Sequence, residues 1–324
     1  MEFDPNNSAP EGSGLFALPF TVDDAAIVIV PAPWDASSSQ GWKSSAAPDA
    51  VYEASKFVEL FDPTYSDFYR RGIAMDSFNA DIRPLNASAI ALQERPQFDS
   101  AALTTICERV NEIIRCQVND HLERGKLVGL LGGDHSVSYG SIEAHLARHS
   151  DMGILQIDAH CDLRCAFDGI QYSHASIMYN VLESLGAPHL VQVGVRGLCD
   201  FEAQYIRESP KVRTFFDTDL HRARARGESW SSVCDRIIDA MPEVVYISLD
   251  VDGLEPAWCP HTGTPVPGGI GYNDAVYLLN SVASSGRKIV GFDLVEVGGD
   301  PFDAGIAAHL LYQLCAILTG QDSD

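Results

Sequence analysis

From residue 127 onward, short apolar runs alternate with segments of helical periodicity. Each run has the length and composition of a strand that is buried on both faces. Strands are predicted at 127–131, 153–157, 190–195, 212–216, 244–250 and 288–294. Helices are predicted at about 138–148, 174–185, 229–240, 273–284 and 303–318. Alternation of this kind is typical of an α/β fold in which helices cover both faces of a mostly parallel sheet.

Fewer helices and strands are predicted in the first part of the chain, before residue 127. Residues 1–24 are predicted to be a flexible N-terminal segment, because residues 1–14 are acidic and rich in Pro, Gly, Asn and Ser. The pattern then predicts a strand at 25–30, a loop at 34–46, a helix at 48–60, an outer strand at 69–75, a loop at 76–99 and a helix at 101–124. No linker or repeat interrupts the alternation, so residues 25–324 are predicted to form a single domain.

The net charge of the chain is −23, from 45 acidic and 22 basic residues. This balance argues against nucleic acid or an anionic membrane as a partner. It mildly favours a cationic small substrate through electrostatic steering, although solubility alone accounts for most of such charge in many acidic enzymes. Neither a signal peptide nor an apolar run of the length of a membrane span is recognised. The eight cysteines form no C-x-x-C pair, so a reducing, cytoplasmic location is expected.

The predicted strand at 153–157 runs directly into Asp158-Ala159-His160-Cys161-Asp162. Residues i, i+2 and i+4 of an extended chain point to the same side, so two carboxylates and one imidazole face a common space, and Cys161 points away from it. The carboxyl ends of the strands are where α/β sheets bind ligands. Because unpaired buried charge is costly, a metal would resolve the conflict among these side chains.

Two other strand ends carry side chains of the same kind. His135 follows the strand at 127–131 through a Gly-Gly turn, and Asp250 and Asp252 come at the end of the strand at 244–250. The three strand ends together supply two imidazoles and four carboxylates. This oxygen-rich set suits a pair of divalent ions and favours Mn²⁺, with Zn²⁺, Ni²⁺, Co²⁺ and Fe²⁺ as alternatives. Such a pair lowers the pKa of a shared water and supplies a nucleophile near neutral pH.

In this order, the motifs resemble those of the ureohydrolases, the family of arginase, agmatinase and guanidinobutyrase. The resemblance rests on residues 132–136, 158–162 and 248–252, followed by the Gly-Thr-Pro signature within 262–269, and it runs from about residue 26 to 318. It implies a three-layer α/β/α fold of the arginase type, two Mn²⁺ per subunit, and hydrolysis of a guanidino group to urea and an amine. It also implies a homo-oligomer, a trimer or a hexamer.

The resemblance further implies that six of these side chains are metal ligands. Two carboxylates would be shared by both ions, and each ion would have one further carboxylate and one imidazole. The shared ligands would be Asp158 and Asp250, with His135 and Asp162 on one ion and His160 and Asp252 on the other.

Three residues match catalytic positions of the family. His174 matches a histidine that moves protons beside the metals, and it would protonate the leaving amine. Asp162 would relay a proton from the bridging water. Glu296 matches the acidic residue that receives the guanidinium group, and its carboxylate would hold the guanidinium carbon near the nucleophile.

Agmatine, which would give putrescine and urea, is the substrate that the sequence favours. The Asp162-Leu163-Arg164 sequence, and the lack of an Asn between residues 164 and 174, look more like agmatinases than arginases. Asp168 is predicted to bind the distal ammonium group of agmatine. Arg164 has two interpretations. It would bind a carboxylate of the substrate, or it would contact the carboxylates that are predicted to be metal ligands.

Other interpretations stay open. Residues 34–46 and 297–300 depart from the agmatinase pattern, which leaves the substrate open and includes an unusual guanidino compound. If Arg164 binds a carboxylate, the alternative is an arginase or a guanidino-acid hydrolase, acting on arginine or guanidinobutyrate. A deacetylase of acetylated amines with this fold is disfavoured, because the chain has no His-His dipeptide. A non-catalytic ureohydrolase-like subunit would have lost ligands, whereas all six ligand positions, His174 and Glu296 are present.

Overall fold

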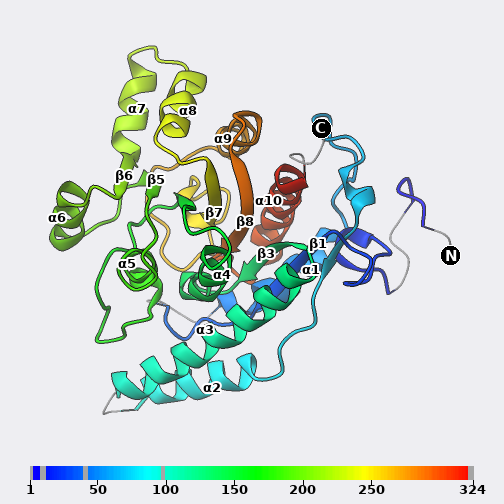
Figure 1. The fold of residues 1–324 in the computed structure, drawn as a ribbon, viewed down its shortest axis with the longest axis horizontal. Coiled ribbons are helices and arrows are strands. Elements are labelled where there is room, and N and C mark those ends of the chain that lie inside the picture. The colour runs from blue at the N-terminus through cyan, green and yellow to red at the C-terminus, as the bar shows by residue number, and fades with distance from the viewer. Residues whose placement is uncertain (1–2, 8–11, 39–42, 96–98, 320–324) are drawn as a thin grey trace.

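The structure, a computed structural model, describes residues 3–7, 12–38, 43–95 and 99–319. One eight-stranded sheet has the order β2-β1-β3-β8-β7-β4-β5-β6, and all its neighbouring strands are parallel (Figure 1). The strands are β1 (Ile27–Ala32), β2 (Ile73–Met75), β3 (Leu127–Gly132), β4 (Gly153–Ile157), β5 (Leu190–Val195), β6 (Val212–Phe216), β7 (Val244–Asp250) and β8 (Lys288–Val295). The central strands are mostly apolar and buried, as a sheet covered on both faces requires.

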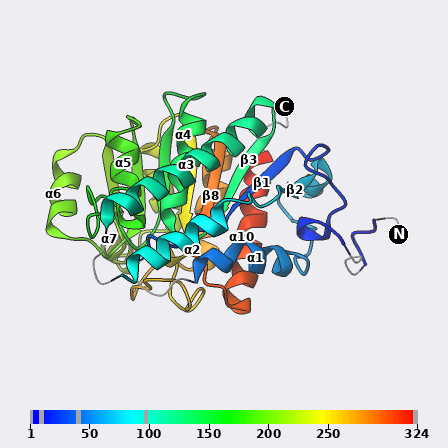
Figure 2. The same cartoon turned by 90° about the horizontal axis from the view of Figure 1, so that it is seen from below.

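Helices cover both faces of this sheet (Figure 2). They are α1 (Ala47–Ser55), α2 (Ile82–Gln93), α3 (Ser100–Glu123), α4 (Ser138–Leu146), α5 (Ile177–Glu183), α6 (Asp200–Glu208), α7 (Asp217–Ala225), α8 (Trp230–Asp239), α9 (Tyr272–Ser284) and α10 (Pro301–Thr319). Helices α1, α8, α9 and α10 pack into one layer, and α2, α3, α4 and α5 pack into the other. The predicted parallel α/β fold with three layers is confirmed.

The segment 76–99 was predicted to be a loop, and this prediction is wrong because the segment contains α2. The mixture of Pro, Asn and Ser in this segment, Pro84 and Asn86 among them, suggested a loop. Pro84 lies in the first turn of α2, where the backbone nitrogen has no partner within the helix, so proline is tolerated there. Asn86 is buried and exchanges two hydrogen bonds of 2.9 Å with Asp35, one through each group of its amide. Tertiary contacts thus stabilise a helix with a weak local signal.

Helices α6 and α7 were not predicted either, because they bury few apolar side chains. Leu220 is the buried apolar residue of α7, and the buried residue of α6 is Glu202. The predicted outer strand at 69–75 is shorter than expected. A turn of 3-10 helix at Phe68–Arg71 occupies its first part, and β2 forms only three residues.

Part of the predicted N-terminal segment packs into the core. Leu15, Phe16 and Leu18 are buried against α1 and α10. The backbone nitrogen of Phe16 donates to Ser55 Oγ at 2.9 Å, and the Phe16 ring lies edge-on to Tyr312 with 4.9 Å between centroids. The apolar core therefore begins before residue 25 on the chain.

Helix α10 is the one helix, within the described ranges, that is long and apolar enough to span a membrane. The sequence pattern alone had not identified such a run, and this expectation is corrected. In the structure, 72% of its most apolar window is buried against the sheet and neighbouring helices. An apolar helix that is buried on most sides is typical of the core of a large α/β domain.

Candidate metal centre

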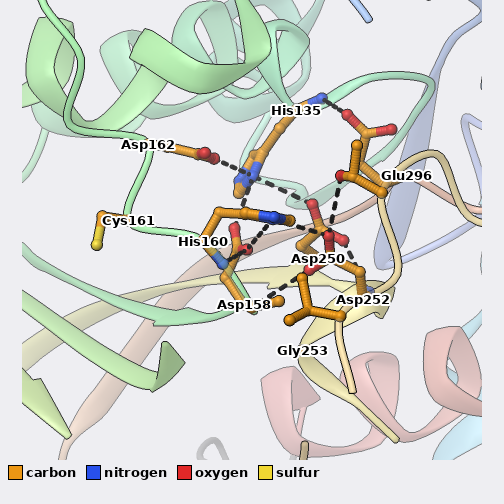
Figure 3. Close-up of polar contacts among 12 residues, drawn as sticks. His135, Asp158, His160, Cys161, Asp162, Asp250, Asp252, Gly253 and Glu296 are labelled. Atoms are coloured by element: carbon orange, nitrogen blue, oxygen red, sulfur yellow. Dashed lines mark hydrogen bonds and ion pairs between the residues drawn. The ribbon is translucent and has the colours of Figure 1, made fainter. Parts of the chain in front are cut away.

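Four neighbouring strands, β3, β8, β7 and β4, end side by side at the carboxyl edge of the sheet. His135 follows β3, Glu296 follows β8, Asp250 ends β7 and Asp158 follows β4. Neighbouring strands lie about 4.8 Å apart, so side chains at these ends are within reach of one another. Figure 3 shows the six predicted ligands gathered into one cluster with Glu296 beside it.

His135 faces three carboxylates through its Nδ1 atom. This nitrogen lies 3.1 Å from Asp158 Oδ2 and 2.9 Å from Asp162 Oδ2. Asp250 Oδ2 is 3.5 Å away. The imidazole is buried, and its Nδ1 atom has no hydrogen bond of good geometry in the described part of the chain. The atom is therefore held against negative oxygens without being used as a donor.

The other nitrogen of His135 determines the tautomer. Nε2 lies 2.8 Å from Ser248 Oγ, and Ser248 Oγ donates its hydrogen to Asp293 Oδ1 at 2.8 Å. A serine hydroxyl has one hydrogen, so Nε2 must donate to Ser248. In the neutral imidazole, Nδ1 then carries no hydrogen, and its lone pair points at the carboxylates. A cation between them would make this arrangement stable, as it does for metal-bound histidines with a hydrogen-bonded second nitrogen.

A second group lies next to the first. His160 Nδ1 is 3.0 Å from Asp252 Oδ2 and 3.6 Å from Asp158 Oδ1. Within each of the sets His135, Asp158, Asp250 and Asp158, His160, Asp252, the ligand atoms all lie within 4.8 Å of one another. Asp158 turns Oδ2 toward His135 and Oδ1 toward His160. A carboxylate in this position fits a ligand that two ions share.

The carboxylates are too close together to be ionised at once without added positive charge. Burial, together with the charge of Asp158, raises the pKa of Asp162 to about 7. Burial and the charges of Asp252 and Asp158 raise the pKa of Asp250 well above its ordinary value. Divalent cations would remove this conflict, and carboxylates with imidazoles are a donor set for hard and borderline ions. The residues therefore fit a pair of metal ions.

Two of the site residues reach the cluster through an unusual backbone. Asp162 and Glu296 have φ angles of 54° and 60°, in the left-handed region that costs a non-glycine residue roughly 1 kcal/mol or more. The chain therefore turns at Asp162, so the extended geometry assumed in the sequence argument ends before this residue. Cys161 is buried, and its side chain points away from the cluster as predicted (Figure 3).

Glu296 lies at the rim of the cluster and is buried. Its Oε1 atom accepts a hydrogen bond of 2.9 Å from the backbone nitrogen of His135, and its carbonyl oxygen accepts one of 2.8 Å from Thr262 Oγ. Burial and the charge of Asp134 raise the pKa of Glu296 well above its ordinary value. A cationic group that bound here would restore the carboxylate form.

His174 lies on the other side of the cluster, at the start of a 3-10 turn (His174–Ser176). Together with His160, Asp162 and Thr264 it lines a cavity of about 280 Å³. Its Nδ1 atom is hydrogen-bonded to the carbonyl oxygen of Ser37, and its ring lies edge-on to Phe167. The imidazole thus contacts the space beside both ligand groups.

Arg164 and Asp168 differ in position. Arg164 lines the cavity, with its Nε atom 3.9 Å from Glu202 Oε2 and its guanidinium 5.1 Å from the centroid of the Phe167 ring. The ion pair of Arg164 is with Glu202 and its ring contact is with Phe167, and neither of these residues is a predicted metal ligand. Asp168 is exposed and is not among the described residues that line the cavity. Its role toward a substrate ammonium stays a prediction.

Three residues of the site were missed by the sequence argument. Ser248 had a signal, because it lies two positions before Asp250 on a strand and therefore shares its side. Ser37 had none, since its partners lie far away in the sequence, and the contact of Glu202 with Leu163 likewise joins residues 39 positions apart. Glu202 is buried and accepts hydrogen bonds from the backbone nitrogens of Leu163 and Cys199.

Imidazoles and carboxylates thus gather at the carboxyl edge of a parallel sheet, an arrangement typical of an α/β protein that binds metal ions there. The model of the arginase family matches residues 25–319. An N(1)-aminopropylagmatine ureohydrolase of Thermus thermophilus is 34% identical, over 90% of this chain and 89% of its own length. An agmatinase of Bacillus subtilis is 27% identical, over 85% and 83%. The crystal structure of agmatine ureohydrolase of Thermoplasma volcanium superposes with a TM-score of 0.73 at 25% identity, covering 93% of this chain and 92% of that one.

The chain belongs to the arginase family. It is therefore a hydrolase that acts on the C–N bond of a guanidino group, as the resemblance implied. The family's enzymes work with a pair of metal ions, and this chain has the His and Asp groups to hold them.

Proposed function

We propose that the protein hydrolyses agmatine, or an agmatine extended at its amine end, to urea and the corresponding amine, with Mn²⁺ as the metal. The observation that carries the proposal is the buried Glu296 carboxylate beside the paired ligand groups, which forms no ion pair with Lys or Arg in the described part of the chain. A guanidinium group is the cation that such a carboxylate binds through two parallel hydrogen bonds.

The residues of the chain have separate tasks in this reaction. His135, Asp158, Asp162 and Asp250 would hold one ion and Asp158, His160, Asp250 and Asp252 the other, and the ions would supply a nucleophilic oxygen at neutral pH. Glu296 orients the guanidinium so that its carbon faces the ligand groups. His174 gives a proton to the amine nitrogen as the C–N bond breaks. The nitrogen then leaves as a neutral amine, which is a far better leaving group than the amide anion.

The amine end of the substrate is favoured over a carboxylate by the surroundings of Arg164. The positive charge of Arg164 is partly compensated by Glu202 and by the face of the Phe167 ring. Glu202 brings a buried carboxylate to the cavity wall, where an ammonium group would be stabilised. The activities named for the Thermus and Bacillus relatives support the same choice.

The test is urea release by the Mn²⁺-loaded protein, repeated with Ni²⁺, from agmatine, N(1)-aminopropylagmatine, arginine and guanidinobutyrate. We expect the highest kcat/KM with one of the two amine-ended compounds. A preference for arginine or guanidinobutyrate would replace the proposal with the guanidino-acid alternative. No urea from any compound, with two metal ions bound, would make the chain a non-catalytic member of the family.

Two further properties are proposed from the sequence, a homo-oligomer and a cytoplasmic location. Light scattering of the metal-loaded protein would give the oligomeric state, with a trimer or a hexamer as the expected result. Fractionation of the source cells would give the location.

Arg164→Gln is expected to improve agmatine binding. Removing the cation leaves the Glu202 carboxylate with its two backbone N–H donors but without the positive charge of Arg164 beside it, so KM for agmatine should fall about three- to tenfold, as a change of roughly 1 kcal/mol produces. The kinetic constants for agmatine and guanidinobutyrate are measured side by side, with Arg207→Gln on the exposed face of α6 as the matched control. A higher KM for agmatine in the Arg164 variant would contradict this account of the cavity.

A further inference from the structure

Ser37 holds His174 at two points, although 137 residues separate them in the sequence. The backbone nitrogen of His174 donates to Ser37 Oγ at 3.0 Å. The imidazole Nδ1 atom of His174 is hydrogen-bonded to the carbonyl oxygen of the same serine. The backbone and the ring of His174 are therefore both fixed against one residue of the loop that follows β1.

Ser37 is in turn fixed by Asp134. Its backbone nitrogen and its Oγ both donate to Asp134 Oδ2, at 2.9 and 2.8 Å. The other carboxylate oxygen of Asp134 accepts from Ser136, from the backbone nitrogen at 3.0 Å and from the hydroxyl. Asp134 is fully buried and directly precedes His135. It therefore connects the loop that carries His135 with the loop that carries Ser37.

The loop of Ser37 is also held from the side of α2. The carboxylate of Asp35 and its backbone nitrogen both bond with the Asn86 amide, and Gln93 donates to the carbonyl oxygen of Ala36. Asp35 Oδ2 further accepts from the backbone nitrogen of Ser45 at 3.1 Å. Ser37 is thus presented to His174 by a loop whose neighbouring residues are anchored in the helical layer.

The donor and the acceptor in each hydrogen bond between His174, Ser37 and Asp134 follow from the chemistry of the groups. A backbone carbonyl can only accept, so Nδ1 of His174 carries a hydrogen. Both oxygens of the Asp134 carboxylate accept hydrogen bonds, so the single hydrogen of Ser37 Oγ points to Asp134, and the hydroxyl oxygen is left to accept from the His174 backbone. In the neutral imidazole with this tautomer, Nε2 is the nitrogen that gains and loses a proton.

We propose that Ser37, anchored by Asp134, is the positioning residue that sets the orientation and the tautomer of His174 for proton transfer to the leaving amine. The proposal rests on the role given to His174 in the proposed function. Ser37 does not touch the reacting atoms. It acts by keeping the protonated Nδ1 turned toward the loop, so that Nε2 is the nitrogen that takes up and gives the proton.

The first test is kinetic. Ser37→Ala leaves the carbonyl in place, but it removes the hydroxyl that joins Asp134 to the His174 backbone. We expect kcat to fall about tenfold, which corresponds to 1.4 kcal/mol, with KM and the content of bound metal unchanged. Ser37→Thr keeps the hydroxyl and should restore most of kcat. Ser88→Ala, on an exposed helical serine of α2, is the matched control.

The second test does not depend on activity. In protein with ¹⁵N-labelled histidines and diamagnetic Zn²⁺ in place of Mn²⁺, the ring nitrogen shifts of His174, assigned with His174→Gln, report the tautomer. We expect the Nδ1–H form in the wild type. In Ser37→Ala the carbonyl that accepts from Nδ1 stays, but it loses the hydroxyl contacts that fix it against His174 and Asp134, so a share of the Nε2–H form should appear.

Each unfavourable result has a distinct meaning. An Nε2–H tautomer in the wild type, or a kcat of Ser37→Ala within twofold of the wild type, would overturn the proposal. A loss of metal together with kcat would also overturn it, since Ser37 would then support the metal centre and not His174. A wild type that releases no urea would refute the proposed function, and the tautomer measurement would still decide the role of Ser37.

Discussion

Asp250→Asn is expected to lose at least one bound metal ion per chain and to lower kcat by roughly 10³-fold or more. The backbone nitrogen of Asp252 donates to Asp250 Oδ1 at 2.8 Å, and an amide oxygen can keep that contact. The amide NH₂ then takes the place of Oδ2, which faces His135. An amide NH₂ points its hydrogens at the metal ion and cannot act as a ligand. The negative charge of the Asp250 carboxylate, which both ions would share, is also lost.

The measurement is the metal content by mass spectrometry after dialysis, together with kcat for the preferred guanidino compound. The matched control is Asp120→Asn on the exposed surface of α3, which should keep both values. Thermal unfolding of the metal-free proteins shows whether the variant folds. If Asp250→Asn kept two ions and wild-type turnover, Asp250 would not be a ligand, and a centre with two ions sharing this carboxylate would have to be abandoned.

The ends of strands were predictable from sequence, because local pattern is enough to find them. Each of β3, β4 and β7 is an apolar run that stops at a polar motif, and the parallel sheet that alternation implies brings such ends to one edge. The structure places His135, Asp158 and Asp250 there as expected. The order of the strands was not predictable, so the sequence could not say that β8 separates β3 from β7.

Several side-chain contacts and one backbone turn were not predicted, because they leave no local pattern in the sequence. Asn86 was interpreted as a loop residue, because its amide looks unfavourable in a helix until Asp35 is placed beside it. Glu202 was not predicted because α6 fully buries no apolar side chain, so the apolar pattern of this helix is weak. The turn at Asp162 escaped because alternation of side chains assumes an extended chain, and a positive φ angle breaks that assumption.

Glu296→Gln is expected to abolish most turnover while both metal ions stay bound. The amide oxygen of glutamine can still accept from the backbone nitrogen of His135, so the loop should keep its shape. The NH₂ group would then take the place of Oε2, and it would meet the N–H groups of the guanidinium. Exchanging a charged acceptor for a donor should lower kcat/KM by roughly 10³-fold.

Metal content separates the two roles that Glu296 can have. Glu296 lies beside the two ligand groups without belonging to either, so a carboxylate that only binds substrate leaves the metal content at the wild-type value. Glu255→Gln, an exposed residue next to the Gly-Thr-Pro loop, is the matched control for the substitution itself. Loss of metal in Glu296→Gln would mean that Glu296 supports the backbone of His135, and wild-type kcat/KM would mean that the guanidinium is held elsewhere. Because the positive φ angle of Glu296 is costly to maintain, and its side chain lines a second cavity of about 230 Å³ together with Thr262 and Gly263, we expect the substrate role.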